Sequence, residues 1–322
     1  MQSILAVTVP FFALVLAGYV AGWRHVLPES AIPGLNAFVL YFALPCMLFR
    51  FGLNTPIAEA LNPTVLAVYL LCALLMVFFT IAVSLDEVVG LKDASFGALV
   101  TAFPNTGFMG VPLLAALFGP TIVGPMIATI LIDMFVTSSL CIALAHSGAG
   151  AGAGGCAVGA REAALRSLRG ALSNPMPWAI ALGGACSVLG WRPSGPVDAV
   201  IRMLADAASP VALFTIGAVL WRAGQHAHHR TEPKRFVPQA LMKLLLHPLL
   251  VLAVGATAMQ WGAGLSPFAL TVMVLTAALP SASNVSLLAE RMGADNGRIA
   301  RIILVTTAAS FLSFSAAVSL VQ

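Results

Sequence analysis

Ten long runs of apolar residues, separated by short polar or charged segments, most constrain what this chain can fold into. Each run approaches the roughly 20 residues that a helix needs to cross a bilayer. The runs are continuous, unlike the roughly 10-residue alternating segments of a membrane β-barrel, so their backbone polar groups can be satisfied only within helices. The sequence therefore predicts an all-α integral membrane protein with spans near residues 3–23, 31–52, 63–84, 94–118, 121–146, 173–191, 198–222, 236–260, 267–290 and 296–321.

Composition excludes several other classes of protein. The chain is 60% hydrophobic and 9% charged, whereas soluble proteins carry about 25% charged residues and disordered ones are poor in hydrophobic residues. A net charge of +4 without a basic cluster does not indicate a nucleic-acid partner. The spans hold no pair of nucleophile and base and the chain has no nucleotide-binding motif, so neither an enzyme nor an ATP-driven pump is expected.

The cysteine and histidine patterns give no reason to expect a metal site or another cofactor. The five cysteines form no C-x-x-C pair, and we interpret them as small buried hydrophobic residues. The histidine-rich run 225–230 is interpreted as a solvated turn.

Basic residues predict the orientation, because cytoplasmic loops of membrane proteins are enriched in Lys and Arg. With the N-terminus outside, three basic residues lie outside, namely Arg50, Arg192 and Arg202. The other 13 of 16 lie inside: Arg24, Lys92, Arg161, Arg166, Arg169, Arg222, Arg230, Lys234, Arg235, Lys243, Arg291, Arg298 and Arg301. The split favours an even number of spans, with both termini outside and the longest connection in the cytoplasm.

Two matching motifs suggest an internal repeat. Spans two and seven share P-x-x-L-F-x-x-G, which begins at Pro45 and at Pro210. Spans four and nine share a Thr-Ala step followed by a mid-span proline, Pro104 or Pro280. We predict five-span repeats at 1–146 and 173–322, joined by a Gly-rich cytoplasmic linker at 147–172. An odd number of spans makes the repeats inverted, as in many secondary transporters.

The fourth and ninth spans are expected to be broken. Pro104 and Pro280 each remove a backbone donor, and both are followed by residues that favour helix N-caps over helix interiors. The unpaired backbone groups must then face each other, a cavity or a ligand. Because helix N-termini attract anions, the expected substrate-binding residues are Pro104, Asn105, Thr106, Gly107, Pro280, Ser281, Ser283 and Asn284. Two tolerated proline kinks are the alternative.

Ionisable residues within spans are costly and often functional. Asp133 lies in the fifth span, where it either couples transport to H⁺ or Na⁺ or acts as a structural acceptor. His247 could titrate or be a satisfied buried imidazole. Lys243 is expected to extend to the cytoplasmic interface, and the four-residue spacing of Arg202 and Asp206 predicts a local ion pair.

The chain resembles the auxin efflux carrier family in three stretches. These are Leu35-Asn36 through Leu44-Pro45, Ala102-Phe-Pro-Asn-Thr-Gly107 and Leu279-Pro-Ser-Ala-Ser-Asn284. The resemblance implies two inverted five-helix repeats, divided into a scaffold and a transport domain, with helices 4 and 9 crossing at their broken centres. It also implies a location in the bacterial inner membrane, a carboxylate substrate and a scaffold-mediated homodimer. Asn36, Pro45 and Pro210 become further gating candidates.

Together these features predict a secondary transporter that moves small organic anions by alternating access. Mono- or dicarboxylates such as malonate fit the predicted site better than auxin, because the second break reads Pro280-Ser281 where the first reads Pro104-Asn105. A membrane sensor or receptor that binds the same ligand without moving it is the alternative.

Overall fold

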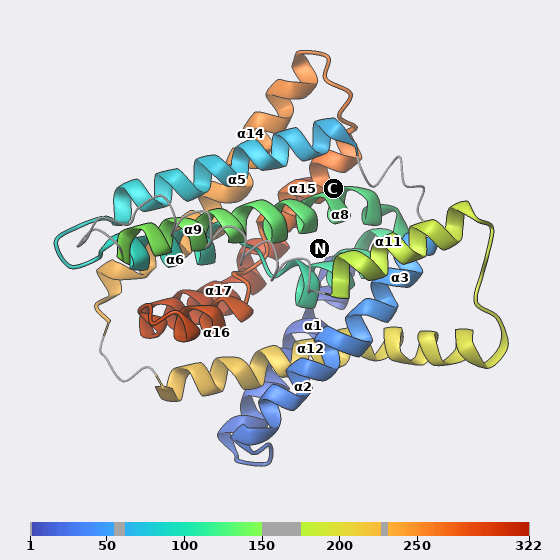
Figure 1. Cartoon of the computed structure of the whole chain (residues 1–322), viewed down its shortest axis with the longest axis horizontal. Coiled ribbons are helices and arrows are strands. Elements are labelled where there is room, and N and C mark those ends of the chain that lie inside the picture. Colours follow the sequence, from blue (N-terminus) through green and yellow to red (C-terminus); the bar gives the residue numbers. More distant parts are fainter. Residues whose placement is uncertain (1, 55–61, 150–174, 227–230, 322) are drawn as a thin grey trace.

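The computed structural model describes residues 2–54, 62–149, 175–226 and 231–321 (Figure 1). These residues are helical and contain no β-strand, which confirms the predicted all-α class. Six helical segments are long and apolar enough to cross a membrane, at Glu29–Asn54, Pro63–Ser84, Val123–Ser147, Gly195–Gln225, Val237–Gln260 and Asn296–Val321. Three shorter apolar helices cover Thr8–Trp23, Thr106–Phe118 and Pro267–Ala277.

Helix is present in each of the ten predicted ranges, although the number of spans stays a prediction. Five ranges hold one continuous helix: α1 (Gln2–Trp23), α5 (Pro63–Ser84), α11 (Pro175–Val188), α12 (Gly195–His226) and α17 (Asn296–Val321). The second range holds α2 (Ile32–Phe38), η2 (Val39–Ala43) and α3 (Leu44–Asn54). The fourth and fifth hold α6 (Leu91–Ala102), η3 (Thr106–Gly110), α7 (Val111–Phe118), η4 (Gly119–Ile122), α8 (Val123–Leu131), η5 (Ile132–Thr137) and α9 (Ser138–Ala149). The eighth and ninth hold α13 (Val237–Leu241), η7 (Met242–Leu246), α14 (His247–Gln260), α15 (Pro267–Ala277) and α16 (Asn284–Arg291).

Proline explains three of the four π-helical turns in these segments. The turns η2, η3 and η7 each end two residues before a proline, which is Pro45, Pro112 or Pro248. A proline cannot donate to the carbonyl four residues earlier, and its ring presses against that carbonyl. A widened π-turn accommodates the ring without ending the helix. The sequence thus places three local distortions along otherwise straight apolar helices.

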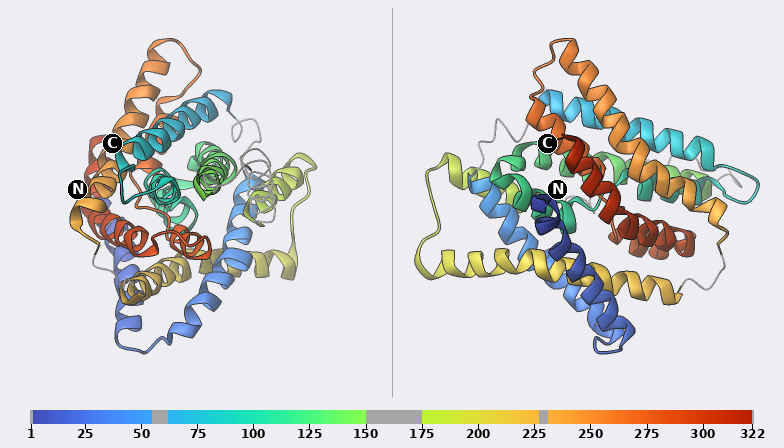
Figure 2. Two further views of the ribbon diagram at one scale, coloured as in Figure 1. Left: turned by 60° about the vertical axis from the view of Figure 1, so that its left-hand side comes forward. Right: turned by 180° about the vertical axis from the view of Figure 1, so that it is seen from behind.

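The helices form two groups (Figures 1 and 2). In the first group, α12 packs against α1 and α3, and α11 packs against α3. In the second, α5, α6, α8, α9, α14 and α15 pack together. Helix α17 contacts both groups, and the ring centroids of Phe12 on α1 and Phe311 on α17 are 5.1 Å apart. The beginning of α1 and the end of α17 lie near each other in all three views.

Glycines allow two helix pairs of the first group to approach at backbone contact. A Cβ atom on Gly217 of α12 would lie 1.9 Å from the carbonyl oxygen of Val15 on α1. A Cβ atom on Gly52 of α3 would lie 2.4 Å from the carbonyl oxygen of Ile180 on α11. Both contacts are impossible for any residue with a side chain, so each glycine is required by packing rather than by backbone conformation.

The same two helix pairs are also joined by glycines of the opposite helix. A Cβ on Gly18 of α1 would lie 1.9 Å from the carbonyl oxygen of Phe214, and one on Gly183 of α11 would lie 2.2 Å from that of Phe49. Phe49 and Phe214 occupy the same position of the P-x-x-L-F-x-x-G motif, as do the glycines of α3 and α12. The motif therefore makes the same contact in both halves of the chain.

The predicted ion pair between Arg202 and Asp206 is wrong. Arg202 instead pairs with Asp198, one turn earlier on α12, at 2.6 Å. Asp206 lies 3.5 Å from Arg50 on α3. Arg202 lies four residues from both Asp198 and Asp206, so the spacing allows either ion pair. The packing of α3 against α12 brings Arg50 to Asp206 and leaves Asp198 as the partner of Arg202. The predicted linker 147–172 and histidine run 225–230 lie largely outside the described residues.

Candidate functional site

The fourth segment is interrupted at Pro104, as the sequence predicts. Helix α6 ends at Ala102, the next residues are extended, and the π-turn η3 begins at Thr106. Pro104 has no N–H to continue the helix. The segment η3–α7 therefore starts as a new helix in the interior of the protein, and its first N–H groups have no intrahelical partners.

The ninth segment is interrupted at the corresponding place. Helix α15 ends at Ala277, and α16 begins at Asn284 with Ser283 as its N-cap residue. Ser283 makes no side-chain capping bond, and the Val285 amide donates to the carbonyl oxygen of Ala282 at 3.3 Å. Pro280 lies within the gap, where its missing donor costs nothing.

The two interruptions meet and satisfy each other. The N–H of Asn105 donates to the carbonyl oxygen of Pro280 at 2.8 Å, and the N–H of Ala282 donates to that of Phe103 at 3.0 Å. These bonds make an isolated antiparallel bridge between Pro104 and Ser281. The prediction that the breaks face each other is confirmed, because buried backbone groups without partners would be costly in an apolar interior.

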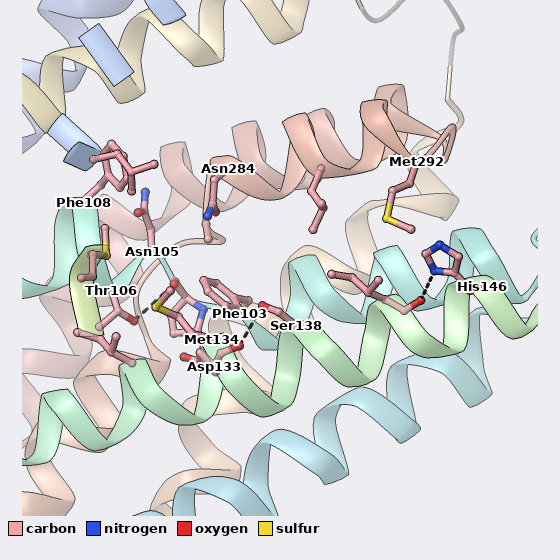
Figure 3. Close-up of a pocket in the computed structure, with 18 residues that line it drawn as sticks. Phe103, Asn105, Thr106, Phe108, Asp133, Met134, Ser138, His146, Asn284 and Met292 are labelled. Carbon is pink, nitrogen blue, oxygen red and sulfur yellow. Dashed lines mark hydrogen bonds between the residues drawn. The ribbon is translucent and has the colours of Figure 1, made fainter. Parts of the chain in front are cut away.

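A cavity of about 440 Å³ extends from this crossing (Figure 3). Asn105 and Asn284 lie near its inner end, and His146 and Met292 lie at the far end. The lining residues come from both breaks and from the fifth segment; they are Leu40, Phe103, Pro104, Asn105, Thr106, Gly107, Phe108, Ile130, Asp133, Met134, Ser138, Ile142, His146, Met176, Ala282, Asn284, Leu288 and Met292. Most are apolar.

The polar lining of the cavity is rich in neutral hydrogen-bond donors. The side-chain amides of Asn105 and Asn284 make no hydrogen bond to another described residue, and Asn284 is exposed to the cavity. The Thr106 hydroxyl lies 3.4 Å from the carbonyl oxygen of Pro104. None of the described lining residues is a lysine or arginine. An anion here would be held by amides, hydroxyls and helix N-termini.

The structure brings some of the predicted site residues together and separates others. Pro104, Asn105, Thr106, Gly107 and Asn284 line the cavity, as does Asp133. The remaining candidates are not among its lining residues; these are Pro280, Ser281, Ser283, Asn36, Pro45, Pro210 and His247. Ser281 is fully buried at the bridge. Pro210 is exposed on α12, whereas Asn36 and Pro45 are half-buried.

Asp133 reaches the cavity from the π-turn η5. Its carboxylate is 1% exposed and accepts hydrogen bonds from the Tyr69 hydroxyl at 3.0 Å and the Thr137 hydroxyl at 3.3 Å. No proline follows this turn closely; instead the Ser138 hydroxyl donates to the carbonyl oxygen of Asp133 at 3.0 Å. The widened turn places both carboxylate oxygens against donors at the cavity wall.

Lys243 does not extend to an interface, so that prediction is wrong. The side chain is fully buried, and Nζ donates to the carbonyl oxygen of Ala277 at 3.0 Å. Nζ also lies 3.0 Å from Nδ1 of His247, one turn later on the same segment. His247 is fully buried, and its Nε2 has no partner among the described residues. Tertiary packing thus turns a residue expected at the surface into a buried lysine.

Several residues of the site carry no signal in the sequence. Tyr69 and Phe108 lie in apolar runs and are typical of core residues, although Tyr69 bonds to Asp133 and Phe108 lines the cavity. The sequence singles out Lys243 and His247 as ionisable residues within a span, but it does not predict their contacts with each other and with Ala277. Among the described residues, no group of three or more metal-ligating side chains is close enough to hold a metal ion.

Comparison with known proteins places this chain in a transporter family. Residues 3–318 match the family described as "Membrane transport protein". The chain is 27% identical to the "Putative malonate transporter" of Rhizobium meliloti (strain 1021), over all of this chain and 97% of that protein. It is 26% identical to the "Uncharacterized transporter YfdV" of Escherichia coli (strain K12), over 88% and 86% of the two chains.

A plant relative is also similar over most of its length. The chain is 23% identical to "Auxin efflux carrier component 8" of Arabidopsis thaliana, over 78% of this chain and 80% of that protein. The family match covers nearly every residue, including both interruptions and the buried charges. The chain therefore belongs to the membrane transport protein family that includes the auxin efflux carriers, and it is a multi-pass membrane transporter rather than an enzyme.

Proposed function

We propose that this transporter carries small organic anions, mono- or dicarboxylates such as malonate, by alternating access at the crossing of the two broken segments. The observation that supports this most is the position of the cavity, whose inner end reaches the start of both half-helices, η3–α7 and α16. Helix N-termini carry partial positive charge and free N–H groups. A carboxylate can be bound there without a lysine or arginine that would hold it too tightly to release.

The residues proposed to bind the carboxylate are those that supply donors at that end. Asn105 and Asn284 offer side-chain amides from opposite breaks, and Thr106 offers a hydroxyl. The apolar walls suit the carbon skeleton of the substrate, and the volume of about 440 Å³ lies within the range of ligand sites, roughly 300–1,000 Å³. The similarity to a protein described as a putative malonate transporter supports malonate as one such substrate.

We further propose that residues 1–146 and 173–322 form inverted repeats joined by a cytoplasmic linker at 147–172. The repeated motif supports this, because its Phe and Gly make the same glycine-mediated contacts in both halves. Two pseudo-equivalent halves give two nearly equal arrangements of the crossing, one open to each side. The first helix group, which the glycines join at backbone contact, would act as the fixed scaffold.

The orientation with both termini outside remains part of this proposal, as does a bacterial inner-membrane location. The distribution of basic residues supports it, and so does the proximity of the beginning of α1 to the end of α17. In this orientation the cavity opens towards the cytoplasm, because it extends to His146 near the end of α9. A homodimer, expected from the family resemblance, stays a prediction.

Uptake by proteoliposomes tests the proposal. Purified protein would be reconstituted with internal unlabelled malonate, and exchange of external labelled malonate, acetate and an indole carboxylate would be measured. We expect saturable exchange of the small carboxylates that Asn105→Ala reduces. A matched control is Asn54→Ala, at the exposed end of α3, where the amide bonds only to the carbonyl oxygen of Arg50. Saturable binding without any flux would favour a sensor or receptor, and neither binding nor flux would refute the site.

A further inference from the structure

A buried lysine side chain lies at the carbonyl end of the first half of the ninth segment. Helix α15 ends at Ala277, and its last carbonyl groups carry partial negative charge. The Lys243 ammonium donates to the Ala277 carbonyl oxygen at 3.0 Å from the proline-widened turn η7. Such a helix end in a low-dielectric interior attracts a cation. In this protein the amino group at that position belongs to a side chain of the chain itself.

A buried carboxylate lies on the cavity side of the same cluster. Asp133 lines the cavity, and its oxygens are held by the hydroxyls of Tyr69 and Thr137. The Tyr69 ring centroid is 6.2 Å from that of His247, whose Nδ1 is 3.0 Å from Lys243 Nζ. The cluster therefore spans from the cavity wall to the end of α15.

We propose that Lys243 is a tethered cation that fills the cation position at the break of the ninth segment, so that the ion that accompanies the substrate is a proton bound by Asp133. This inference rests on the proposed transport of carboxylates. Among the described residues, the other titratable groups of this cluster and of the cavity are Tyr69 and, about one turn later on α5, Cys72, together with His247 at the start of α14 and His146 at the far end of the cavity.

The proposed proton step makes and breaks no bond in the substrate. On one side of the membrane, a proton from water in the cavity binds a carboxylate oxygen of Asp133 as the substrate anion enters. The neutral acid no longer repels the anion, and both are carried to the other side. There the anion leaves with the proton, and Asp133 returns ionised, with Lys243 as the nearby positive charge. One proton therefore moves with each substrate molecule.

The donor set explains why a free metal cation is not expected at this place. A hard cation needs several oxygen ligands around one point. The Ala277 carbonyl oxygen already accepts from Lys243, and each oxygen of Asp133 already accepts from a hydroxyl. A metal ion would also be repelled by the ammonium group of Lys243.

Two assays in proteoliposomes, exchange and net accumulation of malonate, test the transport proposal and this inference separately. Malonate-for-malonate exchange needs no ion gradient and reports whether the protein is a carrier. Net malonate accumulation is then driven by a pH gradient of one unit, acid outside, or by an inward Na⁺ gradient, with the membrane potential clamped by valinomycin and equal K⁺. We expect the pH gradient to drive accumulation of up to about tenfold, the ratio that one proton per substrate permits, and the Na⁺ gradient to drive none.

Two variants and two matched controls test the named residues. In Asp133→Asn, we expect the pH gradient to drive no accumulation and the exchange rate to become independent of pH. In Lys243→Gln, which keeps an N–H donor for Ala277, we expect the pH midpoint of exchange to move upwards, because an ionised carboxylate loses its positive neighbour. The controls Asp198→Asn and Lys234→Gln remove the same charges from exposed ion pairs and should behave as wild type.

Each possible result bears on either the proton-coupling inference or the transport proposal. Exchange with accumulation that follows Na⁺ and ignores pH would overturn the inference and leave the transport proposal standing. Unaltered pH dependence in Asp133→Asn would also overturn it, whereas absence of exchange of every carboxylate in the wild type would refute the transport proposal. Because the wild-type measurements identify the coupling ion without any substitution, failure of a variant to fold does not prevent a decision.

Discussion

The backbone contact of Gly217 on α12 with α1 predicts that Gly217→Ala destabilises the protein. The new Cβ would lie 1.9 Å from the carbonyl oxygen of Val15 and 2.6 Å from the backbone N of Tyr19. Both atoms belong to the backbone of α1, so no side chain can rotate away. To reach even 3.0 Å from the oxygen, the helices must separate locally by about 1 Å, which disrupts close packing along the pair.

The size of the effect follows from the cost of overpacking. Adding methyl groups to a well-packed interior costs about 1–3 kcal/mol, occasionally more, and an immovable backbone neighbour puts this site at the upper end. The substitution also gains about 0.5–1 kcal/mol, because alanine favours helix over glycine. The expected net loss is about 2 kcal/mol. At about 2–4 °C per kcal/mol, the midpoint of thermal unfolding should fall by several degrees.

Thermal unfolding in detergent, followed by tryptophan fluorescence, measures this change. Gly52→Ala should show a loss of the same kind, because Gly52 makes the corresponding contact with Ile180 at 2.4 Å. Gly224→Ala is the matched control on the same helix as Gly217, since a Cβ there meets nothing within 4 Å; it should raise the midpoint slightly. If Gly217→Ala melts at or above the wild-type temperature, the glycine contacts do not limit the approach of these helices.

Three further predictions concern the site and one loop. Asn105→Ala should weaken carboxylate binding by about 10–100-fold, because a hydrogen bond to a charged group contributes about 1.5–3 kcal/mol; titration calorimetry measures it. Pro248→Ala should let the turn η7 tighten and withdraw Lys243 from Ala277, and lower both the melting midpoint and pH-driven accumulation. The amides of Val89 and Val88 hold the pKa of Asp86 below its ordinary value. The amides of Val88 and Val89 should therefore be protected from hydrogen exchange at pH values above the ordinary pKa of an aspartate, and lose this protection as the pH falls through the lowered pKa of Asp86. Hydrogen exchange measured as a function of pH tests this, and in Asp86→Asn both amides should be unprotected at every pH.

The proposed proton on Asp133 has a simple electrostatic basis. Two like charges about 6 Å apart, at an effective dielectric constant of about 20, repel by about 3 kcal/mol. Repulsion of this size would weaken binding of an anionic substrate by about a hundredfold. Protonation of Asp133 removes it, so substrate and proton should bind together.

The sequence alone determined the helices and where they break. Runs of apolar residues about 20 long can satisfy their backbone in lipid only as helices, and a proline followed by residues that prefer N-cap positions favours a break in the helix. Both signals are local, and for that reason the ten helical ranges and the interruptions at Pro104 and Pro280 could be predicted. The repeated P-x-x-L-F-x-x-G motif was likewise visible, although its contacts with α1 and α11 were not.

Only the tertiary structure decided which of these local features meet. The bond from Asn105 to Pro280 joins residues far apart in the chain, and nothing in either motif specifies the other as its partner. Lys243 illustrates this best. A lysine near the end of a membrane helix extends to the membrane surface unless the fold supplies a buried acceptor for its amino group. That acceptor is the Ala277 carbonyl, which is unpaired only because α15 stops there and lies within reach only because the helices pack as they do.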